Sequence, residues 1–393
     1  MNALEGIKIV ELTTAAAGPT CTKLLIEYGA DCIMVEPKGG MVNRFTPQFD
    51  FMNTHKKAIV VDLKSPDGMV VMHRLLEDAD VFVSNYRYKA LTKLKLDYDS
   101  IKDKYPRLVY AFLTGYGEHG DMADDPGFDN TAFWCRAGLL HDMTEKGCAP
   151  PMPPVSPSGL GDILCGATLA LGVTTALHER NKTGKGTKVC TSLLSLGLYA
   201  NFSQMILNQY GTEYPKTRLK PNRALSNSYP AKDGYIYLIT LDFKKDFFKL
   251  LKALGREDLV DDPRWTCMKD TEGEKALELR EILDEAFSKY TIAELREIFK
   301  SIDMALGEYR GCADEINDPQ AIANDYLLKM TNYDGKEITV PASPLKFGYK
   351  KPVQVDTAAP IGYDTISILK KVGYADTEIE ALINNQAVFA EGR

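Results

Sequence analysis

The sequence lacks the marks of an exported, metal-binding or membrane protein. Its eight cysteines, at 21, 32, 135, 148, 165, 190, 267 and 312, include no Cys-x-x-Cys pair, so we expect free, buried, reduced thiols. Its five histidines show no metal-ligand spacing. No stretch approaches the ~20 apolar residues of a membrane span, and the N-terminus shows no signal peptide. We therefore expect a cytoplasmic protein without a metal or a membrane partner.

Several motifs that would fix a reaction are also absent. No Gly-x-Gly-x-x-Gly follows the first predicted strand and no Walker A motif occurs, which argues against a dinucleotide or phosphate-loop enzyme. Without a Gly-x-Ser-x-Gly elbow, a serine hydrolase of the common type has no support. The net charge of -7 argues against binding to nucleic acid or an anionic membrane.

What is present describes an ordinary globular chain of two domains. The 393 residues exceed one small core, and 45% are hydrophobic. Short, nearly continuous apolar strands alternate with helical segments in the first ~115 residues, which predicts an α/β fold with a mostly parallel sheet covered on both faces. The predicted strands are 7–12, 31–36, 57–63, 80–85 and 108–114.

The second half of the chain has a different character. A segment rich in Pro, Lys and Arg, 211–228, reads as a linker, and a smaller α-rich domain follows over 229–320. Thr291 and Glu294 have the spacing of a capping box for one of its helices, and Thr377 with Glu380 has the same spacing near the C-terminus.

Asp162 is the most informative residue. The run 154–162, PVSPSGLGD, brings this aspartate through two prolines and two glycines to the start of an apolar helix over 163–180. A helix start favours negative charge and lowers the proton affinity of a carboxylate, so we expect an ionised group suited to covalent catalysis. The alternative is that Asp162 only caps the helix.

Short runs in a fixed order give the chain a family resemblance. The runs are LEGIKIVEL at 4–12, AGP at 17–19, YGAD at 28–31, VEP at 35–37, KKAIVVDLK at 56–64, NYR at 85–87, GYG at 115–117, PGFD at 126–129, GD at 161–162, RNKTGKG at 180–186 and APIG at 359–362. With these runs the chain resembles the class III CoA-transferases, the family of formyl-CoA transferase and carnitine CoA-transferase. Within that family it looks most like the phenyllactate and 2-hydroxyisocaproate CoA-transferases of amino-acid-fermenting anaerobes.

The resemblance implies a fold and a reaction. The fold is a large Rossmann-like, CoA-binding domain built from 1–210 and 321–393, a smaller domain, and two linkers, with two chains interlocked as a homodimer. The substrates are an acyl-CoA and a small carboxylic acid, a 2-hydroxyacid for the closest subgroup, and no cofactor is tightly bound. Asp162 falls on the catalytic aspartate, which attacks the thioester, forms a mixed anhydride and then carries CoA as an aspartyl thioester.

The resemblance also implies a set of CoA contacts. Lys64 and Lys93 would supply charge for the phosphates, and Tyr86 would stack on the adenine. The alternatives are solvated lysines and a core aromatic side chain. The residues placed at CoA-binding positions are Val61, Lys64, Asn85, Tyr86, Arg87, Lys93 and Phe128.

Other functions stay open at this point. An acyl-CoA racemase of the same superfamily needs a base where this chain has Phe128, and Asp129 reads as a turn or structural carboxylate. Carnitine-type and formate/oxalate-type acids are further alternatives for the acceptor. Thr14, Ala15 and Ala16 stand where the formyl-CoA enzymes carry polar and histidine residues, which suggests a different acyl substrate from theirs. A non-catalytic CoA-binding subunit is a further alternative. A set of apolar residues would either line an acyl pocket or pack in the core. These residues are Met41, Phe45, Phe49, Phe51, Phe133, Trp134, Met143 and Met152.

Overall fold

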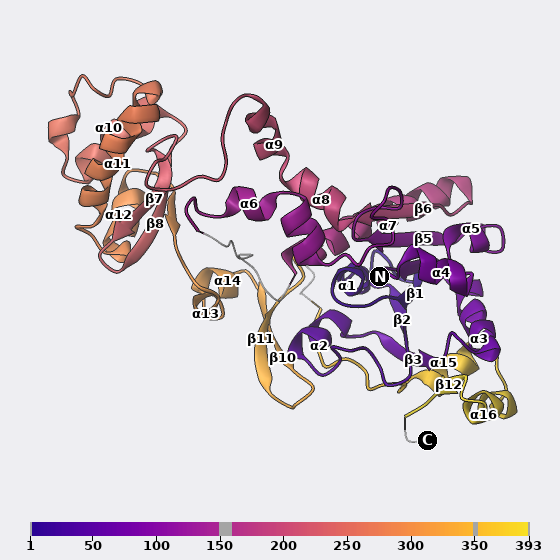
Figure 1. Cartoon of the computed structure of the whole chain (residues 1–393). Coiled ribbons are helices and arrows are strands. Elements are labelled where there is room, and N and C mark those ends of the chain that lie inside the picture. The colour runs from indigo at the N-terminus through magenta and orange to yellow at the C-terminus, as the bar shows by residue number, and fades with distance from the viewer. Residues whose placement is uncertain (1, 149–158, 349–352, 392–393) are drawn as a thin grey trace. The chain divides into compact units, whose positions relative to one another are not determined.

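The computed structural model describes residues 2–148, 159–348 and 353–391 (Figure 1). These residues form two compact units. The first unit holds the described residues within 1–140, 153–206 and 318–393, and the second unit holds those within 141–152 and 207–317. Domain boundaries at 210 and 320 remain predictions about independently folding parts.

A seven-stranded sheet forms the centre of the first unit (Figure 1). The strand order is β12-β3-β2-β1-β4-β5-β6, and every neighbouring pair is parallel except β12 with β3. The order 3-2-1-4-5-6 is that of a Rossmann-like sheet, which confirms the predicted α/β class. The strands are β1 Lys8–Leu12, β2 Asp31–Glu36, β3 Lys57–Val61, β4 Val81–Ser84, β5 Val109–Thr114, β6 Lys188–Ser192 and β12 Val388–Phe389.

Helices cover both faces of this sheet because alternate strand residues point to opposite faces. Ile9 and Val83 belong to a core with α1 (Ala17–Glu27) and α7 (Leu160–Thr183). Val10 and Phe82 belong to the core of the other face. That face is covered by α3 Pro66–Glu77, α4 Tyr88–Leu94, α5 Tyr98–Ile101, α15 Thr365–Lys371 and α16 Asp376–Asn384.

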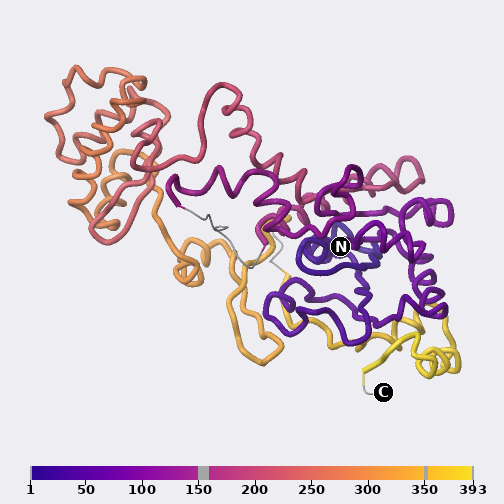
Figure 2. The backbone as a smooth tube through the Cα atoms, viewed as in Figure 1, coloured from indigo at the N-terminus to yellow at the C-terminus, as the bar shows by residue number. Residues whose placement is uncertain are grey.

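Both ends of the chain contribute to the first unit. Val388 of β12 lies opposite Val61 of β3, so the yellow C-terminal segment runs beside an indigo-to-purple strand in Figure 2. The remaining elements that include first-unit residues are α2 Pro47–Asn53, the π-helical turn η1 Asp129–Arg136, α6 Leu139–Met143, α8 Leu193–Ala200, α9 Phe202–Gln209, α14 Pro319–Ala323 and the hairpin of β10 Leu327–Thr331 with β11 Glu337–Pro341.

The expectation that no segment is apolar enough to span a membrane is wrong for α7. Among the described residues, this one helix meets the criterion of length and composition, with a mean hydropathy of 1.6 over 18 residues. Its packing gives another reason for the apolar sequence. A Cβ atom at Gly166 would lie 2.4 Å from the carbonyl oxygen of Ala17, so α7 meets α1 at backbone contact. One side of α7 belongs to the core of this unit, with Cys165, Leu169 and Val173 buried.

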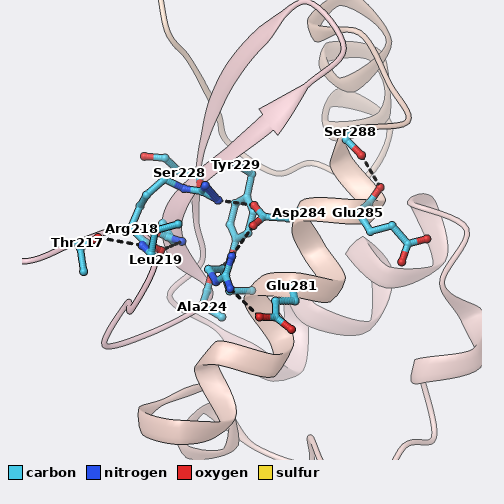
Figure 3. A network of polar contacts seen from close by, with 12 residues as sticks. Thr217, Arg218, Leu219, Ala224, Ser228, Tyr229, Glu281, Asp284, Glu285 and Ser288 are labelled. Atoms are coloured by element: carbon cyan, nitrogen blue, oxygen red, sulfur yellow. Dashed lines mark hydrogen bonds and ion pairs between the residues drawn. The ribbon is translucent and has the colours of Figure 1, made fainter. Parts of the chain in front are cut away.

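The second unit packs helices on one face of a three-stranded antiparallel sheet. Its elements are β7 Ser226–Ala231, β8 Gly234–Ile239, β9 Leu306–Glu308, α10 Phe243–Ala253, α11 Gly273–Phe287, α12 Ile292–Ser301, α13 Cys312–Glu315 and the short 3-10 turns η2 Glu257–Leu259 and η3 Met268–Thr271. Arg218 pairs with Asp284 of α11 (Figure 3). Arg280 pairs with the same aspartate. The capping box of Thr291 with Glu294 is confirmed at the start of α12.

Two local predictions are wrong. The last helix, α16, begins at Asp376, and Glu378 accepts the backbone N–H of Ala375 at 2.7 Å, so the cap lies two residues before Thr377 and Glu380. The cysteines are all free, but five of them are exposed: Cys135, Cys148, Cys190, Cys267 and Cys312. Cys190 is exposed because it lies on β6, the last strand at one edge of the sheet.

Candidate active site

The site is built around the point where the order of the strands reverses. The chain leaves β1 toward β2 on one side and leaves β4 toward β5 on the other, which opens a crevice between their carboxyl ends. The ladder between the two strands ends with Leu12 opposite Ser84. A side chain adds a bond at this last pair, because the Ser84 hydroxyl donates to the Leu12 carbonyl oxygen at 2.8 Å.

Asn85 makes the next connection across this crevice. Its Oδ1 accepts the backbone N–H of Thr14 at 2.8 Å, and its Nδ2 donates to the Thr14 carbonyl oxygen at 2.7 Å. The amide thus replaces the two backbone bonds that a further residue of a strand would make. The turn after β1 is therefore fixed to β4.

A buried ion pair supports the same turn from the sheet side. Glu11 and Lys56 have fully buried side chains 2.8 Å apart, and Lys56 also donates to the carbonyl oxygen of Pro19 at 3.2 Å. The Glu11 carboxylate accepts from Thr13 and Thr22 at 2.5 Å each. Burial acts to raise the pKa of Glu11, but Lys56 and the two hydroxyls outweigh it and lower this pKa. The pair was not anticipated, although a Lys and a Glu in apolar surroundings were visible in the sequence.

Asp162 lies in the first turn of α7, which begins at Leu160, three residues before the predicted start. Gly159 is the residue before the helix and has a left-handed backbone with φ 64°. A Cβ atom on Gly159 would lie 2.7 Å from Oδ2 of Asp162, so the carboxyl group folds over a glycine. The alternative that Asp162 is the cap residue is therefore wrong. The preceding residues 154–158 of the same motif lie outside the described residues.

A second carboxyl group stands against the first. Oδ1 of Asp129 accepts the backbone N–H of Asp162 at 3.1 Å. A Cβ atom at Gly161 would lie 2.4 Å from that same Oδ1 and 2.3 Å from Cγ of Phe133. Only glycine at 161 lets the two chain segments meet this closely. Asp129, which the sequence suggested as a turn or structural carboxylate, is thus a neighbour of the candidate nucleophile.

The charge state of Asp162 differs from the prediction. Burial, and second the charge of Asp129, raise the pKa of Asp162 to about 7. Burial also raises the pKa of Asp129, and this effect is larger than the lowering of that pKa by the backbone N–H groups of Asp162 and Gly161. The helix start alone would favour the ionised form, but desolvation and the like charge outweigh it. Asp162 is therefore divided between its acid and carboxylate forms near neutral pH.

Close backbone contacts connect this pair with the carboxyl edge of the sheet. Gly115 follows β5, and a Cβ atom there would lie 2.6 Å from Cα of Gly127. This contact holds the segment that leads into Asp129 against the end of β5. On the other side, Gly166 contacts Ala17 one helical turn after Asp162. The two carboxyl groups thus lie at the strand ends where α/β sheets bind ligands.

The predicted CoA-binding residues follow β3 and β4, whose carboxyl ends lie at this edge. Val61 is 2% exposed and its side chain packs in the core. The predicted contact between Val61 and CoA would therefore have to involve the backbone of Val61. Lys64 is exposed in the turn after β3. Because β1 and β2 lie between β3 and β4, Val61 and Lys64 are separated from the residues after β4 by two strands.

The residues after β4 differ in what they offer a ligand. The amide of Asn85 is already bonded to Thr14. Tyr86 packs partly against the core of the second face, and burial raises the pKa of its hydroxyl. Arg87 and Lys93 are exposed cations. Phe128 is 64% exposed beside Asp129. A role in CoA binding stays a prediction for each of them.

The apolar residues considered for an acyl pocket are mostly core. Phe49, Phe133 and Trp134 are at most 3% exposed, so these three do not line an open pocket. Phe45 is 68% exposed. Met152 lies outside the described residues. Among the described residues, no three His, Cys, Asp or Glu side chains come together as a metal site would require.

Comparisons with known proteins agree with this architecture. The family model for CoA-transferase family III matches residues 4–365. The chain is 35% identical to the (R)-2-hydroxy-4-methylpentanoate CoA-transferase of Clostridioides difficile, over 98% of this chain and 99% of that protein. It is also 35% identical to the cinnamoyl-CoA:phenyllactate CoA-transferase of Clostridium sporogenes, over 97% of this chain and 96% of that protein.

Solved structures give the same result. A CAIB/BAIF family protein from Brucella suis superposes with a TM-score of 0.80 at 26% identity, covering 95% of this chain and all of that one. A hypothetical protein from Mycobacterium tuberculosis superposes with a TM-score of 0.81 at 27% identity, covering 93% and 99%. The resemblance seen in the short runs is confirmed across nearly the whole length, and this chain is an enzyme that belongs to CoA-transferase family III.

Proposed function

We propose that this enzyme moves CoA from an acyl-CoA to a carboxylic acid through covalent intermediates on Asp162. The Asp162 carboxylate attacks the thioester carbonyl, giving a mixed anhydride and CoA thiolate. The thiolate attacks the aspartyl carbonyl, which releases the donor acid and leaves an aspartyl-CoA thioester. The acceptor carboxylate attacks that thioester, and the thiolate then attacks the acceptor carbonyl of the second anhydride. Acyl-CoA leaves and Asp162 returns as a carboxylate, so no net proton or water is needed.

The pair of Asp129 and Asp162 carries this proposal. A carboxylate with a pKa of about 7 is a stronger nucleophile than an ordinary one, and about half of it is ionised at neutral pH. Partial burial also limits the access of water, which protects an anhydride from hydrolysis. A carboxylate that only capped a helix would be stabilised in its charged form, which lowers its pKa. The pKa of Asp162 is instead raised.

We propose a 2-hydroxyacid as the acceptor, such as 2-hydroxyisocaproate or phenyllactate. The support is the similarity to two enzymes whose names state such substrates. Enzymes with other printed acceptors, glutarate and oxalate, are less similar at 28% and 26% identity. With these substrates the enzyme would serve amino-acid fermentation in the cytoplasm of an anaerobe.

We also propose that the enzyme works as an interlocked homodimer. The support is the number of large apolar side chains that are exposed on α7, α8 and α9. Exposed apolar side chains that gather on a surface mark sites of protein–protein contact. The residues are Ile163, Leu164, Leu171, Leu198, Tyr199, Phe202, Met205 and Ile206.

The test of the reaction is to trap the intermediate. The enzyme is mixed with cinnamoyl-CoA alone, treated with hydroxylamine or borohydride, and digested for mass spectrometry. The expected result is a modified peptide that contains Asp162 in the wild type and in Asp125→Asn, an exposed control. Asp162→Asn should show no modification and lose at least about a thousandfold in turnover. An active enzyme with an unmodified peptide would contradict the proposal.

The same enzyme preparation distinguishes a racemase from a transferase. It would exchange the proton next to the thioester carbonyl with deuterated solvent in a single acyl-CoA that carries such a proton. A transferase does nothing net until a second carboxylic acid is added. Exchange without any acceptor, together with an unlabelled Asp162, would favour the racemase.

A further inference from the structure

We infer that Asn85 is a positioning residue that fixes the turn after β1 and, through α1, the place of Asp162. The inference deepens the proposed function and rests on it. It also replaces the contact with CoA that the family resemblance implied for the Asn85 side chain. The turn in question is residues 13–18, between the end of β1 and the first turn of α1.

The bonding of the Asn85 amide is the first argument. One oxygen and one N–H of the amide are bonded to the two backbone groups of a single residue, Thr14. Ser84, one residue earlier, is bonded to Leu12 in the same direction. The Ser84 side chain thus adds a bond at the last pair of the β1–β4 ladder, and the Asn85 side chain extends the ladder past that pair. An amide held at both ends is not free to turn toward a ligand with the same two groups.

The backbone of the turn is the second argument. Ala15 has a φ of 58°, in the left-handed region that residues with a Cβ seldom occupy. Its side chain is exposed, so packing does not hold it there. The bonds of the neighbouring Thr14 to Asn85 are what keep the chain in this conformation. Gly18 completes the tight turn, because a Cβ atom there would lie 2.5 Å from Cγ2 of Thr13.

The path from the turn to Asp162 is the third argument. The turn leads directly into α1, whose first residue, Ala17, has its carbonyl oxygen against Gly166 of α7. Gly166 lies one helical turn after Asp162. Backbone contact without intervening side chains leaves little room to absorb a shift. A displacement of the turn should therefore move the start of α7 and the nucleophile on it.

The experiment separates positioning from ligand contact. Asn85→Ala and Asn85→Asp are compared with the wild type by the dissociation constant of CoA in calorimetry, the rate of hydroxylamine-trapped label on Asp162 at saturating cinnamoyl-CoA, and the melting temperature. For Asn85→Ala we expect the labelling rate to fall about ten- to a hundredfold, with the CoA dissociation constant changed by less than about twofold. Asn85→Asp should be intermediate, because its carboxylate still accepts the Thr14 N–H but cannot donate to the carbonyl.

A rescue variant tests the mechanism further. Glycine occupies left-handed conformations without strain, so Ala15→Gly added to Asn85→Ala should restore part of the labelling rate. An Asn85→Ala enzyme with weaker CoA binding and a normal labelling rate at saturation would overturn the inference, and so would a double variant no faster than the single one. Should Asn85→Ala not fold, Asn85→Asp with and without Ala15→Gly gives the same comparison. A wild type without label on Asp162 would instead contradict the proposed function, whatever the Asn85 variants do.

Discussion

Asp129 binds the backbone N–H of Asp162 through a carboxyl oxygen 3.1 Å away, and its own charge opposes ionisation of the Asp162 side chain. One residue thus holds the start of α7 in place and raises the proton affinity of the proposed nucleophile on it. The geometry depends on Gly161, which leaves no Cβ between them.

The labelling of Asp162 should depend on pH. The attacking form is the carboxylate, so its fraction rises as pH increases through the pKa of about 7. We expect the rate of label formation with cinnamoyl-CoA to rise about tenfold per pH unit below pH 6 and to level off above pH 8. Rapid-quench measurements from pH 5 to pH 9 check this. A flat profile from pH 5 upward would indicate an ordinary, low pKa.

Asp129→Asn should shift that profile to lower pH. The amide oxygen can still accept the N–H of Asp162, but the like charge is gone, so the pKa of Asp162 falls. Because burial is the larger cause of the raised pKa, the shift should be partial. The measurement is the same labelling series, with Asp125→Asn as the control. An unchanged midpoint in a well-folded variant would show that Asp129 does not affect the titration.

Asp162→Asn should stabilise the protein above neutral pH while abolishing turnover. A carboxyl group whose pKa is raised in the folded state does not lower the free energy of unfolding at a pH below 3.8, its pKa in the unfolded chain. As the pH rises above 3.8 the group increasingly lowers the free energy of unfolding, and the effect is complete above pH 7. The side chain is only partly buried, so solvent screening limits the gain to roughly 1 kcal/mol. Melting temperatures at pH 5 and pH 8 check this, with the larger increase expected at pH 8.

Gly161→Ala should disrupt the site. The new Cβ would need space now held by Phe133 and Asp129, so we expect a loss of roughly 2 kcal/mol in the free energy of unfolding and a strongly reduced labelling rate. Gly311→Ala is the matched control, because its Cβ would have a nearest neighbour at 3.8 Å and its φ is -96°. Denaturant unfolding and the labelling assay measure both variants. Equal behaviour of the two would contradict the close contact.

Tyr199→Glu combined with Phe202→Glu should convert the proposed dimer to monomers. These side chains are 78% and 58% exposed on the apolar surface of the first unit, and burying two carboxylates in an interface is costly. Light scattering coupled to size-exclusion chromatography gives the mass. The control is Tyr363→Glu, a tyrosine that is 64% exposed outside that surface. A wild-type monomer, or a double variant that stays dimeric, would contradict the proposal.

Much of the fold was predictable from local patterns. The strands β1 to β5 of the sheet were visible as apolar runs, and the capping box at Thr291 was visible as a spacing. The two-residue strand β12 was not predicted. Such signals depend on neighbours in the sequence. The wrong cap predicted at Thr377 has the same spacing as the right one, because spacing alone does not say where a helix begins.

The sequence by itself determined that the chain is an α/β enzyme of a known family and that Asp162 stands at the start of an apolar helix. It did not determine the charge of that aspartate. The tertiary structure decided this by bringing Asp129, 33 residues away, against the same backbone. The structure also decided that the Asn85 amide faces Thr14, 71 residues before it. Proton affinity and side-chain direction depend on burial and on neighbours in space, and only folding creates both.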